Sequence, residues 1–209
     1  MKKYPGRPRE FEPQDFLDTA LTCFWQNGYR ATSLSDLMKA SGLASASIYK
    51  LYPDKRTIFL AALRQYMDAG LARLSQREAE LKPEVALRET LDFCALLSAG
   101  PDGERGCFSI AAASEMLPGD DDVRIRIEYM FKGIVARLCT ILLKGQKEGV
   151  FRTDDEANVM AESIFMMLEG MRVYGKIKPD IATLRKANAF IMNSVLSTAD
   201  ERHNITERE

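Results

Sequence analysis

Apolar residues recur with the period of an α-helix along most of the chain, and no segment alternates β-branched and polar residues as a strand would. In residues 13–27, for example, Phe16, Ala20 and Phe24 fall on one face of a predicted helix. Gly28 supplies the backbone freedom with which that helix can end. Helices with one apolar face must be buried against other helices, so the sequence predicts an all-α fold.

Two short helices are predicted after this first helix. Ser33 is a good N-cap for the first of them, and Asp36 places an acid in its first turn. Gly42 can adopt the positive φ of a tight turn, and the second short helix is predicted over about Ser45–Leu51. A long helix begins at about Lys55. This is the helix-turn-helix layout, which places the second short helix in the major groove of DNA.

Three stretches of this region carry a family pattern: GYRATSLSDL at residues 28–37, SGL at 41–43 and SIYKLYPDK at 47–55. In composition and mutual spacing they resemble the DNA-binding domain of the tetracycline-repressor (TetR) family, and the resemblance covers about residues 10–63 without a gap. It implies an N-terminal three-helix helix-turn-helix domain followed by a larger helical domain for ligand binding and dimerisation. Departures from the pattern leave the base preference open; they are Ala44, Ala46 and Leu51.

The charge of the chain is divided unevenly along its length. The formal net charge is −1, which by itself speaks against a nucleic-acid binder. Residues 1–66, however, carry ten Lys and Arg against six Asp and Glu, whereas residues 67–209 carry 19 against 24. A basic N-terminal part on an acidic remainder is expected when only one end of a protein approaches a polyanion.

The predicted DNA contacts combine residue chemistry with the resemblance. Ser and Lys can bond to base edges, Ala can touch a thymine methyl, and amides at a helix N-terminus can bind phosphate. A basic arm over residues 1–10 fits a narrow minor groove. The alternatives are a solvated helix surface, helix caps and a solubilising tail. The predicted contacts are Arg7, Arg9, Thr32, Ser33, Ser35, Ser45, Ala46, Ser47, Tyr49, Lys50 and Lys55.

The rest of the chain reads as a second, helical domain. The predicted domains are residues 1–64 for DNA binding and 65–200 for effector binding and dimerisation, with a polar tail over 201–209. Thr153 and Glu156 have the spacing of a capping box. After the long helix, the predicted helices cover about residues 83–99, 107–117, 121–148, 154–174 and 181–197.

The last two predicted helices are apolar nearly all round, so both sides of each must be covered. The resemblance implies that this pair forms a four-helix bundle with the same pair of a second copy, although a large monomeric core is the alternative. Such a homodimer would match a palindromic operator. The predicted interface residues are Met160, Ile164, Met167, Met171, Leu184, Phe190, Ile191 and Val195.

A small-molecule pocket is also implied by the resemblance, because family members release DNA when a small molecule binds in this domain. Met and aromatic residues at helical spacing are otherwise explained by plain packing. The candidate lining residues are Phe93, Leu97, Cys107, Phe108, Met116, Tyr129, Met130, Phe165, Met166 and Tyr174.

Cys107 carries a separate hypothesis. It lies at a predicted helix N-terminus and next to Arg105, and both features would lower the pKa of its thiol. A thiolate there would make the protein responsive to an electrophile or an oxidant, as some relatives with Gly-Cys at this place are. The alternative is a buried, inert thiol.

Other classes of function find little support in the sequence. The single His203 lies in the polar tail, and there is no nucleophile–base constellation, no C-x-x-C pair and no Gly-rich phosphate loop. No enzymatic activity, cofactor, metal or membrane partner is therefore expected, and the protein is expected in the cytoplasm. The alternatives to a ligand-released repressor are a helical enzyme or carrier with a vestigial DNA-binding domain and an adaptor that contacts only proteins.

Overall fold

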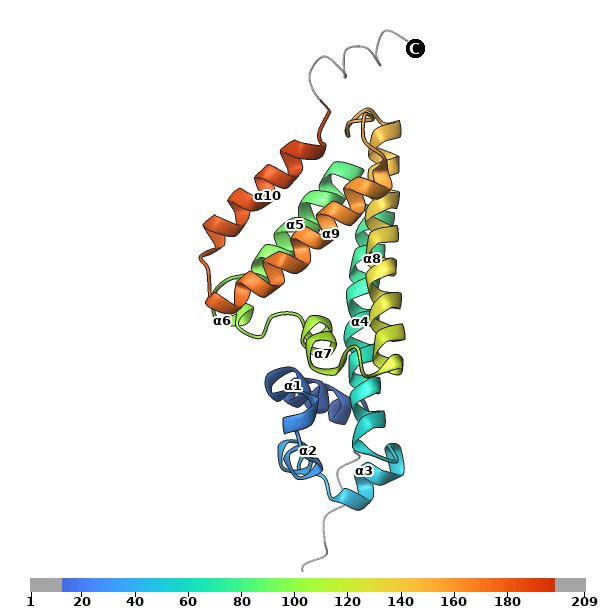
Figure 1. Ribbon diagram of the computed structural model, residues 1–209, viewed down its shortest axis with the longest axis vertical. Helices are drawn as coiled ribbons and strands as arrows, with labels where there is room; N and C mark the ends of the chain where they lie inside the picture. Colours follow the sequence, from blue (N-terminus) through green and yellow to red (C-terminus); the bar gives the residue numbers. More distant parts are fainter. Residues whose placement is uncertain (1–12, 198–209) are drawn as a thin grey trace, which may run out of the picture. The chain divides into compact units, whose positions relative to one another are not determined.

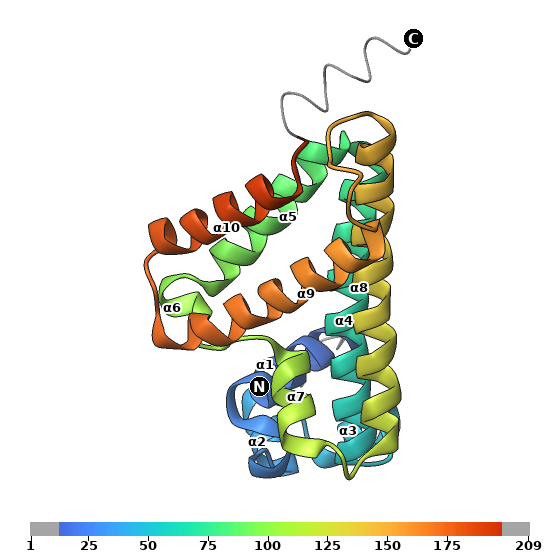
Figure 2. The ribbon, with the colours of Figure 1, turned by 45° about the horizontal axis from the view of Figure 1, so that its top comes forward.

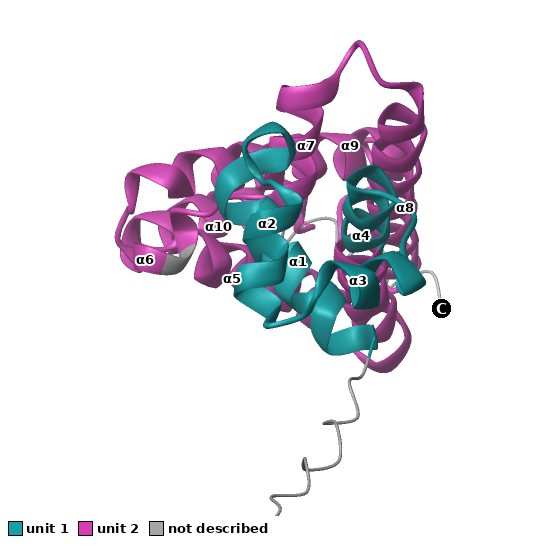
Figure 3. Cartoon of the chain, turned by 90° about the horizontal axis from the view of Figure 1, so that it is seen from below, with its two compact units in different colours: residues 1–64 teal, residues 65–209 magenta. Residues whose placement is uncertain are grey.

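The computed structural model describes residues 13–197, and every regular element in this range is a helix. Extended pairing within the range is limited to an isolated antiparallel bridge between Phe151 and Leu196. The predicted all-α class is therefore confirmed. The chain divides into two compact units, residues 1–64 (unit 1) and residues 65–209 (unit 2), coloured separately in Figure 3. Across residues 13–197, no helix has the length and apolar character needed to cross a membrane.

Unit 1 contains one helix of 19 residues, two short helices and the beginning of a long helix. Its elements are α1 (Pro13–Ala31), α2 (Leu34–Ser41), α3 (Ser45–Leu51) and the beginning of α4 (Lys55–Glu80), labelled in Figure 1. Within α1, Gly28 has φ 81° and ψ 170°, which interrupts the helical path as the sequence predicts.

Both ends of α2 are specified by local chemistry. The Ser33 hydroxyl accepts a hydrogen bond from the Asp36 amide (3.1 Å), and the Asp36 carboxylate accepts one from the Ser33 amide (2.8 Å). This reciprocal pair is a capping box, which satisfies amides that the first turn leaves without a helical partner. At the other end, Gly42 adopts a left-handed conformation (φ 71°) and its amide bonds to the Met38 carbonyl. The turn between α2 and α3 is therefore fixed by residues that the sequence already identifies.

An aromatic cluster holds the helices of unit 1 together. The ring of Phe24 packs edge-on against Phe59 of α4, with 5.3 Å between the ring centroids, and Tyr29 lies 4.8 Å from the same Phe59 ring. Leu37 of α2 and Ile48 of α3 are fully buried. Each short helix thus contributes at least one side chain to the core of unit 1, and α2 packs on both α1 and α3.

Unit 2 is a packed array of longer helices. Besides the rest of α4, its elements are α5 (Pro83–Ser98), α6 (Gly100–Gly103), α7 (Phe108–Met116), α8 (Asp121–Lys147), α9 (Ala157–Tyr174), the 3₁₀ turn η1 (Gly175–Ile177) and α10 (Ile181–Val195). Figures 1 and 2 show α9 lying against α8 and α5, while α10 packs mainly on α5. The short α6 falls in a stretch where the sequence predicts only a loop.

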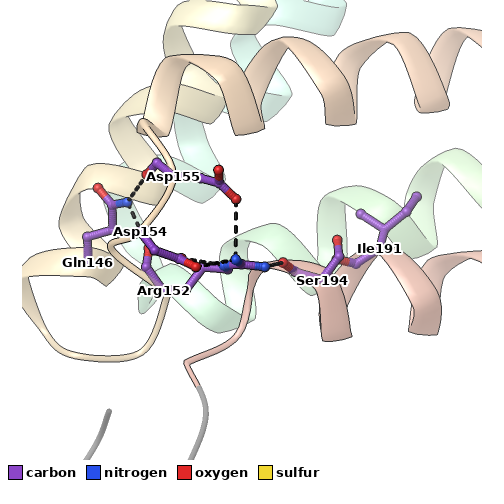
Figure 4. Close-up of polar contacts among 6 residues, drawn as sticks. All are labelled: Gln146, Arg152, Asp154, Asp155, Ile191 and Ser194. Carbon is purple, nitrogen blue, oxygen red and sulfur yellow. Dashed lines mark hydrogen bonds and ion pairs between the residues drawn. The ribbon is translucent and has the colours of Figure 1, made fainter.

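The start of α9 differs from the prediction. The sequence predicts a capping box between Thr153 and Glu156, but α9 begins at Ala157 and its N-cap, Glu156, makes no side-chain capping bond. The physical reason is Arg152, whose guanidinium binds the carboxylates of Asp154 and Asp155 and the Ser194 carbonyl of α10 (Figure 4). These contacts hold residues 152–155 in an irregular turn between α8 and α9.

The buried side chain of Phe151 packs beneath the same turn. Its buried ring lies against Gly145 of α8 so closely that a Cβ there would be 2.1 Å from the ring. Backbone bonds from Arg152 to Val195 (3.0 Å) and from Ser197 to Val150 (3.0 Å) then tie the turn to the end of α10. The C-terminal end of α10 is therefore held by backbone pairing as well as by its apolar face.

Candidate functional site

The surface of α3 combines one buried anchor with an exposed polar face. Ile48 points into the core, and the residues around it on the helix, Ala46, Ser47, Tyr49 and Lys50, are exposed. Ser45 at the beginning of the helix is half-buried. A short helix with hydroxyl, ammonium, phenol and methyl groups on its outer face has the chemistry needed to read base edges and to bind phosphate.

Lys55, predicted as a phosphate contact, is engaged within unit 1. Its ammonium donates hydrogen bonds to the carbonyls of Tyr29 and Thr32, both at 2.9 Å. It also lies 4.4 Å from the centroid of the Tyr29 ring, a cation–π contact. The side chain therefore joins the start of α4 to the end of α1 and to the residue before the N-cap of α2.

Thr32 and Ser33 are likewise occupied by structural bonds. Thr32 is buried, and its hydroxyl donates to the Gly28 carbonyl at 2.7 Å. The Ser33 hydroxyl donates to the Asp36 carboxylate at 2.6 Å, in addition to its capping bond. An incoming phosphate at Ser33 would meet this carboxylate, whose pKa the bonds from Ser33 lower. Ser35, in contrast, is exposed. Arg7 and Arg9 lie outside the described residues.

Unit 2 contains a cavity of about 120 Å³. The helices α4, α5, α8 and α9 contribute most of its walls, and Cys107 precedes α7. The lining is apolar over most of its area and includes four charged side chains that the sequence does not single out. The lining residues are Tyr66, Gly70, Arg73, Leu74, Arg77, Thr90, Phe93, Cys94, Leu97, Cys107, Met130, Ile134, Phe165, Leu168, Glu169 and Arg172.

Arg172 organises one wall of this cavity. It is 6% exposed, and its guanidinium donates to the carbonyls of Leu97 and Gly106 and to the Ser98 hydroxyl (3.3 Å). One side chain of α9 thereby holds the end of α5 and the segment before α7. Its terminal nitrogens Nη1 and Nη2 thus donate to oxygen atoms of the backbone and to a hydroxyl within the protein.

Cys107 does not have the lowered pKa that the sequence predicts. The thiol is 5% exposed, and burial raises its pKa, with the nearby Glu169 adding to the effect. Arg105 is exposed, and the cation that acts on the thiol is Arg172, whose effect is smaller than that of burial. The Tyr66 hydroxyl donates to the Cys107 sulfur at 3.6 Å. Of the two hypotheses for Cys107, the burial of its side chain favours the buried thiol over the thiolate, because the desolvation of a buried thiol outweighs the helix dipole.

The predicted ligand-binding residues divide into two groups. Phe93, Leu97, Cys107, Met130 and Phe165 do line the cavity. The others do not line it: Phe108 is buried in an edge-on contact with Tyr66, Met116 is half-buried, and the side chains of Tyr129, Met166 and Tyr174 are exposed. Aromatic and Met content identifies candidates for an apolar wall but not the direction in which each points.

The cavity residues that are not predicted from the sequence come largely from α4 and from the charged residues of α9. A signal for the latter exists in the sequence, since Glu169 and Arg172 are three residues apart in the otherwise apolar stretch 164–174. Charged side chains placed in a helix that must be buried need partners or a function. For Tyr66 and Arg73 of α4 no comparable local signal is present.

The predicted dimer residues also divide, by exposure. Met160, Ile164, Met171, Leu184, Ile191 and Val195 are buried within unit 2, whereas Met167 and Phe190 are 43% and 68% exposed. Further exposed apolar side chains on α9 are Val159, Met166, Val173 and Tyr174. A groove of about 400 Å³ runs between α9 and α10, lined by Met167, Gly170, Met171, Tyr174, Thr183, Leu184, Ala187, Phe190 and Ile191. Five of the predicted residues thus line this groove, namely Met167, Met171, Leu184, Phe190 and Ile191, whereas Met160, Ile164 and Val195 belong to the buried core of unit 2.

Two sequence models of protein families match the chain. The model described as "Bacterial regulatory proteins, tetR family" matches residues 16–75, which contain α2, α3 and the contacts of Lys55. The model described as "Tetracyclin repressor-like, C-terminal domain" matches residues 83–191, more than half of the chain.

Individual relatives agree with these matches. The chain is 29% identical over 178 residues to the HTH-type transcriptional repressor ComR of Escherichia coli K12, covering 83% of both chains. It is 26% identical over 182 residues to the uncharacterized HTH-type transcriptional regulator YezE of Bacillus subtilis, covering 86% of this chain and 94% of YezE. A cysteine mutant of the TetR family regulator CifR, solved with 26-bp double-strand operator DNA, has the same fold, with a TM-score of 0.78 and 22% identity over 91% of this chain and 100% of that one.

Proposed function

Because the chain belongs to the TetR family of bacterial regulatory proteins, we propose that it represses transcription by binding a palindromic operator as a homodimer. The chain is a helix-turn-helix transcriptional regulator, a non-enzymatic class of protein. The observation that carries the proposal is the exposed polar face of α3, which follows a turn made by the left-handed Gly42 at the C-terminal end of α2. A small molecule bound in the cavity of unit 2 releases the operator.

The DNA contacts that we propose follow from exposure. Ala46, Ser47, Tyr49 and Lys50 meet bases and phosphates in the major groove, with Ser45 and Ser35 at the edge of the contact. Arg7 and Arg9 remain proposed minor-groove contacts. Thr32, Ser33 and Lys55 act by building the unit, since their side-chain polar atoms are bonded within it.

Replacing the exposed Lys50 by Ala tests the reading of DNA by α3. An operator selected from random DNA should bind the wild-type protein with an affinity that falls steeply with salt, because phosphate contacts release counterions. The variant should lose affinity, and its slope of log affinity against log salt should become shallower by about 1 for each lost phosphate contact. Lys147→Ala, which alters an exposed lysine at the end of α8, is the control and should match the wild type. Failure to select any sequence above background would contradict the proposal.

The homodimer is supported by the apolar surface of α9 and α10. Phe190 and Met167 stand beside the groove between these helices, and exposed apolar side chains gathered in one area are typical of protein interfaces. Gly170 has open space around it, so the backbone of α9 is accessible at this point. A two-fold contact would cover this area on both copies and set the spacing of the two α3 helices.

Phe190→Asp is expected to shift the protein from dimer to monomer at micromolar concentration. A carboxylate in place of a ring at the centre of an apolar interface loses buried area and adds a charge that cannot be solvated there. Size-exclusion chromatography with light scattering measures the change. Ile125→Asp alters a side chain of similar exposure (56%) on α8 and should leave the dimer intact. A Phe190→Asp protein that remains dimeric would place the interface elsewhere.

The effector that we propose is a molecule that binds without covalent chemistry. An electrophile or oxidant would need a reactive thiolate, and burial raises the pKa of Cys107. The pKa of Cys94, on the same cavity, is raised to about 12 by its burial. Both thiols are therefore protonated at neutral pH and contribute to the wall of the cavity as small apolar groups.

A further inference from the structure

The chemical class of the cavity's ligand can be inferred from Glu169. This residue belongs to α9 and lines the cavity between apolar neighbours. Its Oε2 atom is buried, and no residue between 13 and 197 donates a hydrogen bond to it. A buried acceptor without a donor is costly for the folded state, so an atom of this kind in a cavity wall points to a donor on the molecule that occupies the cavity.

The Glu169 carboxyl also interacts with two residues of the protein. The Cys107 thiol is hydrogen-bonded to it, and Arg172 acts on it from one turn away. Burial is the larger influence and raises the pKa of Glu169 to about 7. At neutral pH the carboxyl is therefore ionised in only about half of the molecules, and Oε2 can accept a bond from a neutral donor.

The other charges on the cavity are positive and argue against a cationic ligand. Arg172 lines the cavity with its donors committed to Leu97, Ser98 and Gly106. Arg73 and Arg77 lie over the ring of Phe93, at 5.3 and 4.8 Å from its centroid. An ammonium group in this space would be repelled by three guanidinium groups and attracted by one carboxyl that is ionised in only about half of the molecules at neutral pH.

The size and the remaining walls of the cavity set the shape of the ligand. Its volume of about 120 Å³ is close to that of an engineered apolar cavity of roughly 150 Å³ that admits benzene. The walls next to Glu169 are apolar or aromatic, with Phe93, Phe165, Met130 and Leu168 among them. Such walls favour a flat, apolar body.

We propose that this cavity binds an uncharged molecule about the size of one benzene ring, with a single O–H or N–H group that donates to Oε2 of Glu169. The inference deepens the proposed function and rests on it in one respect, namely that the occupant of this cavity is the effector. The ring lies among Phe93, Met130 and Phe165, and the donor group points to α9.

Phenol and toluene test this directly on the full-length wild-type protein, because they differ by a hydroxyl in place of a methyl at nearly equal size. Titration calorimetry should show phenol binding about tenfold more tightly than toluene, as expected for a site with an unpaired acceptor. Benzylamine, positively charged at neutral pH, should bind more weakly than phenol. Toluene binding as tightly as phenol, or benzylamine binding more tightly, would overturn the proposal.

Glu169→Leu identifies the acceptor. The variant should lose the preference for phenol and bind toluene at least as well, because its wall is apolar throughout. Glu162→Leu, an exposed residue on the same helix, should keep the preference. NMR spectra of ¹³C-methyl methionine locate the ligand: phenol should shift the signal of Met130 in the cavity and leave the exposed Met166 unchanged. A phenol preference retained in Glu169→Leu overturns the proposal. If that variant does not fold, the comparison of phenol, toluene and benzylamine on the wild-type protein tests the proposal by itself.

One further measurement tests the proposed function independently of the ligand class. Operator release by phenol is followed by fluorescence anisotropy of labelled operator DNA. Release together with the phenol preference supports both statements. The phenol preference with the operator still bound supports the ligand class and shows that this cavity does not control DNA binding. Release without any difference between phenol and toluene supports control by the cavity and overturns the role of Glu169.

Discussion

Lys55→Met should weaken operator binding by at least about tenfold while leaving the dependence on salt almost unchanged. The ammonium of Lys55 holds the Tyr29 and Thr32 carbonyls, each at 2.9 Å, and lies over the Tyr29 ring. Hydrogen bonds from charged groups contribute roughly 1.5–3 kcal/mol each, less where the side chain is half-buried as here, so unit 1 should lose about 2–3 kcal/mol. The geometry between α1, α2 and α4 would loosen, and with it the presentation of α3.

The salt dependence distinguishes this role from a phosphate contact. A lysine that binds phosphate contributes about one unit to the slope of log affinity against log salt, whereas a lysine that holds the fold contributes to affinity at every salt concentration. Lys50→Met is the matched comparison, because Lys50 is exposed and belongs to α3. It should lower the slope and leave the melting temperature unchanged. Lys55→Met with an unchanged melting temperature and a slope lowered by about one would show that Lys55 binds phosphate directly.

Arg172→Leu should be the most destabilising of the substitutions considered, by about 3–5 kcal/mol of the free energy of unfolding. The side chain is 6% exposed and binds two backbone carbonyls and the Ser98 hydroxyl. Leucine would leave the carbonyls of Leu97 and Gly106 buried without donors, and it would remove the cation that favours ionised Glu169. Lysine would not restore the contacts, because one ammonium lacks the planar fork that reaches several acceptors at once.

Urea unfolding followed by circular dichroism measures this effect. Arg88→Leu is the control: Arg88 is exposed and pairs with Glu84 one turn away on α5, at 2.8 Å. An exposed ion pair of this spacing contributes about 0.3–0.5 kcal/mol, so the control should unfold close to the wild type. An Arg172→Leu protein within about 1 kcal/mol of the wild type would mean that the carbonyls find other donors.

Local rules predict unit 1 well. Ser33 and Asp36 form the capping box, Gly42 takes the left-handed turn, and α3 covers Ser45–Leu51 as expected. Each of these features depends on residues within a few positions of one another, so a short segment of sequence already contains both partners of every contact. Lys55 is the exception, since its partners lie 23 and 26 residues away.

The cavity depends on contacts between distant residues and was predicted only in part. Tyr66 of α4 reaches Cys107, 41 residues later, and Arg172 reaches Leu97, 75 residues earlier. Periodicity identifies the apolar face of each helix but not which faces meet. The pKa of Cys107 shows the consequence, because the helix N-terminus is visible in the sequence, whereas the burial that raises the pKa is not.

The outcome for α9 and α10 has the same origin. Both helices are apolar on more than one side, and the sequence alone does not say which side is used within the chain. In the structure α9 packs on α8 and α5, and α10 packs on α5. Ile164, Leu184 and Ile191 are buried, whereas the side chains of Phe190 and Met167 are exposed. The predicted set therefore mixes residues of the chain's own core with residues of the proposed interface.

The helical periodicity of the sequence determined the all-α class, and short-range capping and turn residues determined the form of the helix-turn-helix unit, because both signals are local. The tertiary structure decided the rest. It gave Lys55 internal acceptors, kept the Cys107 thiol protonated, and left Oε2 of Glu169 without a donor beside an apolar cavity. Burial and the pairing of polar groups arise only when segments distant in the chain come together, and they set the chemistry of each site.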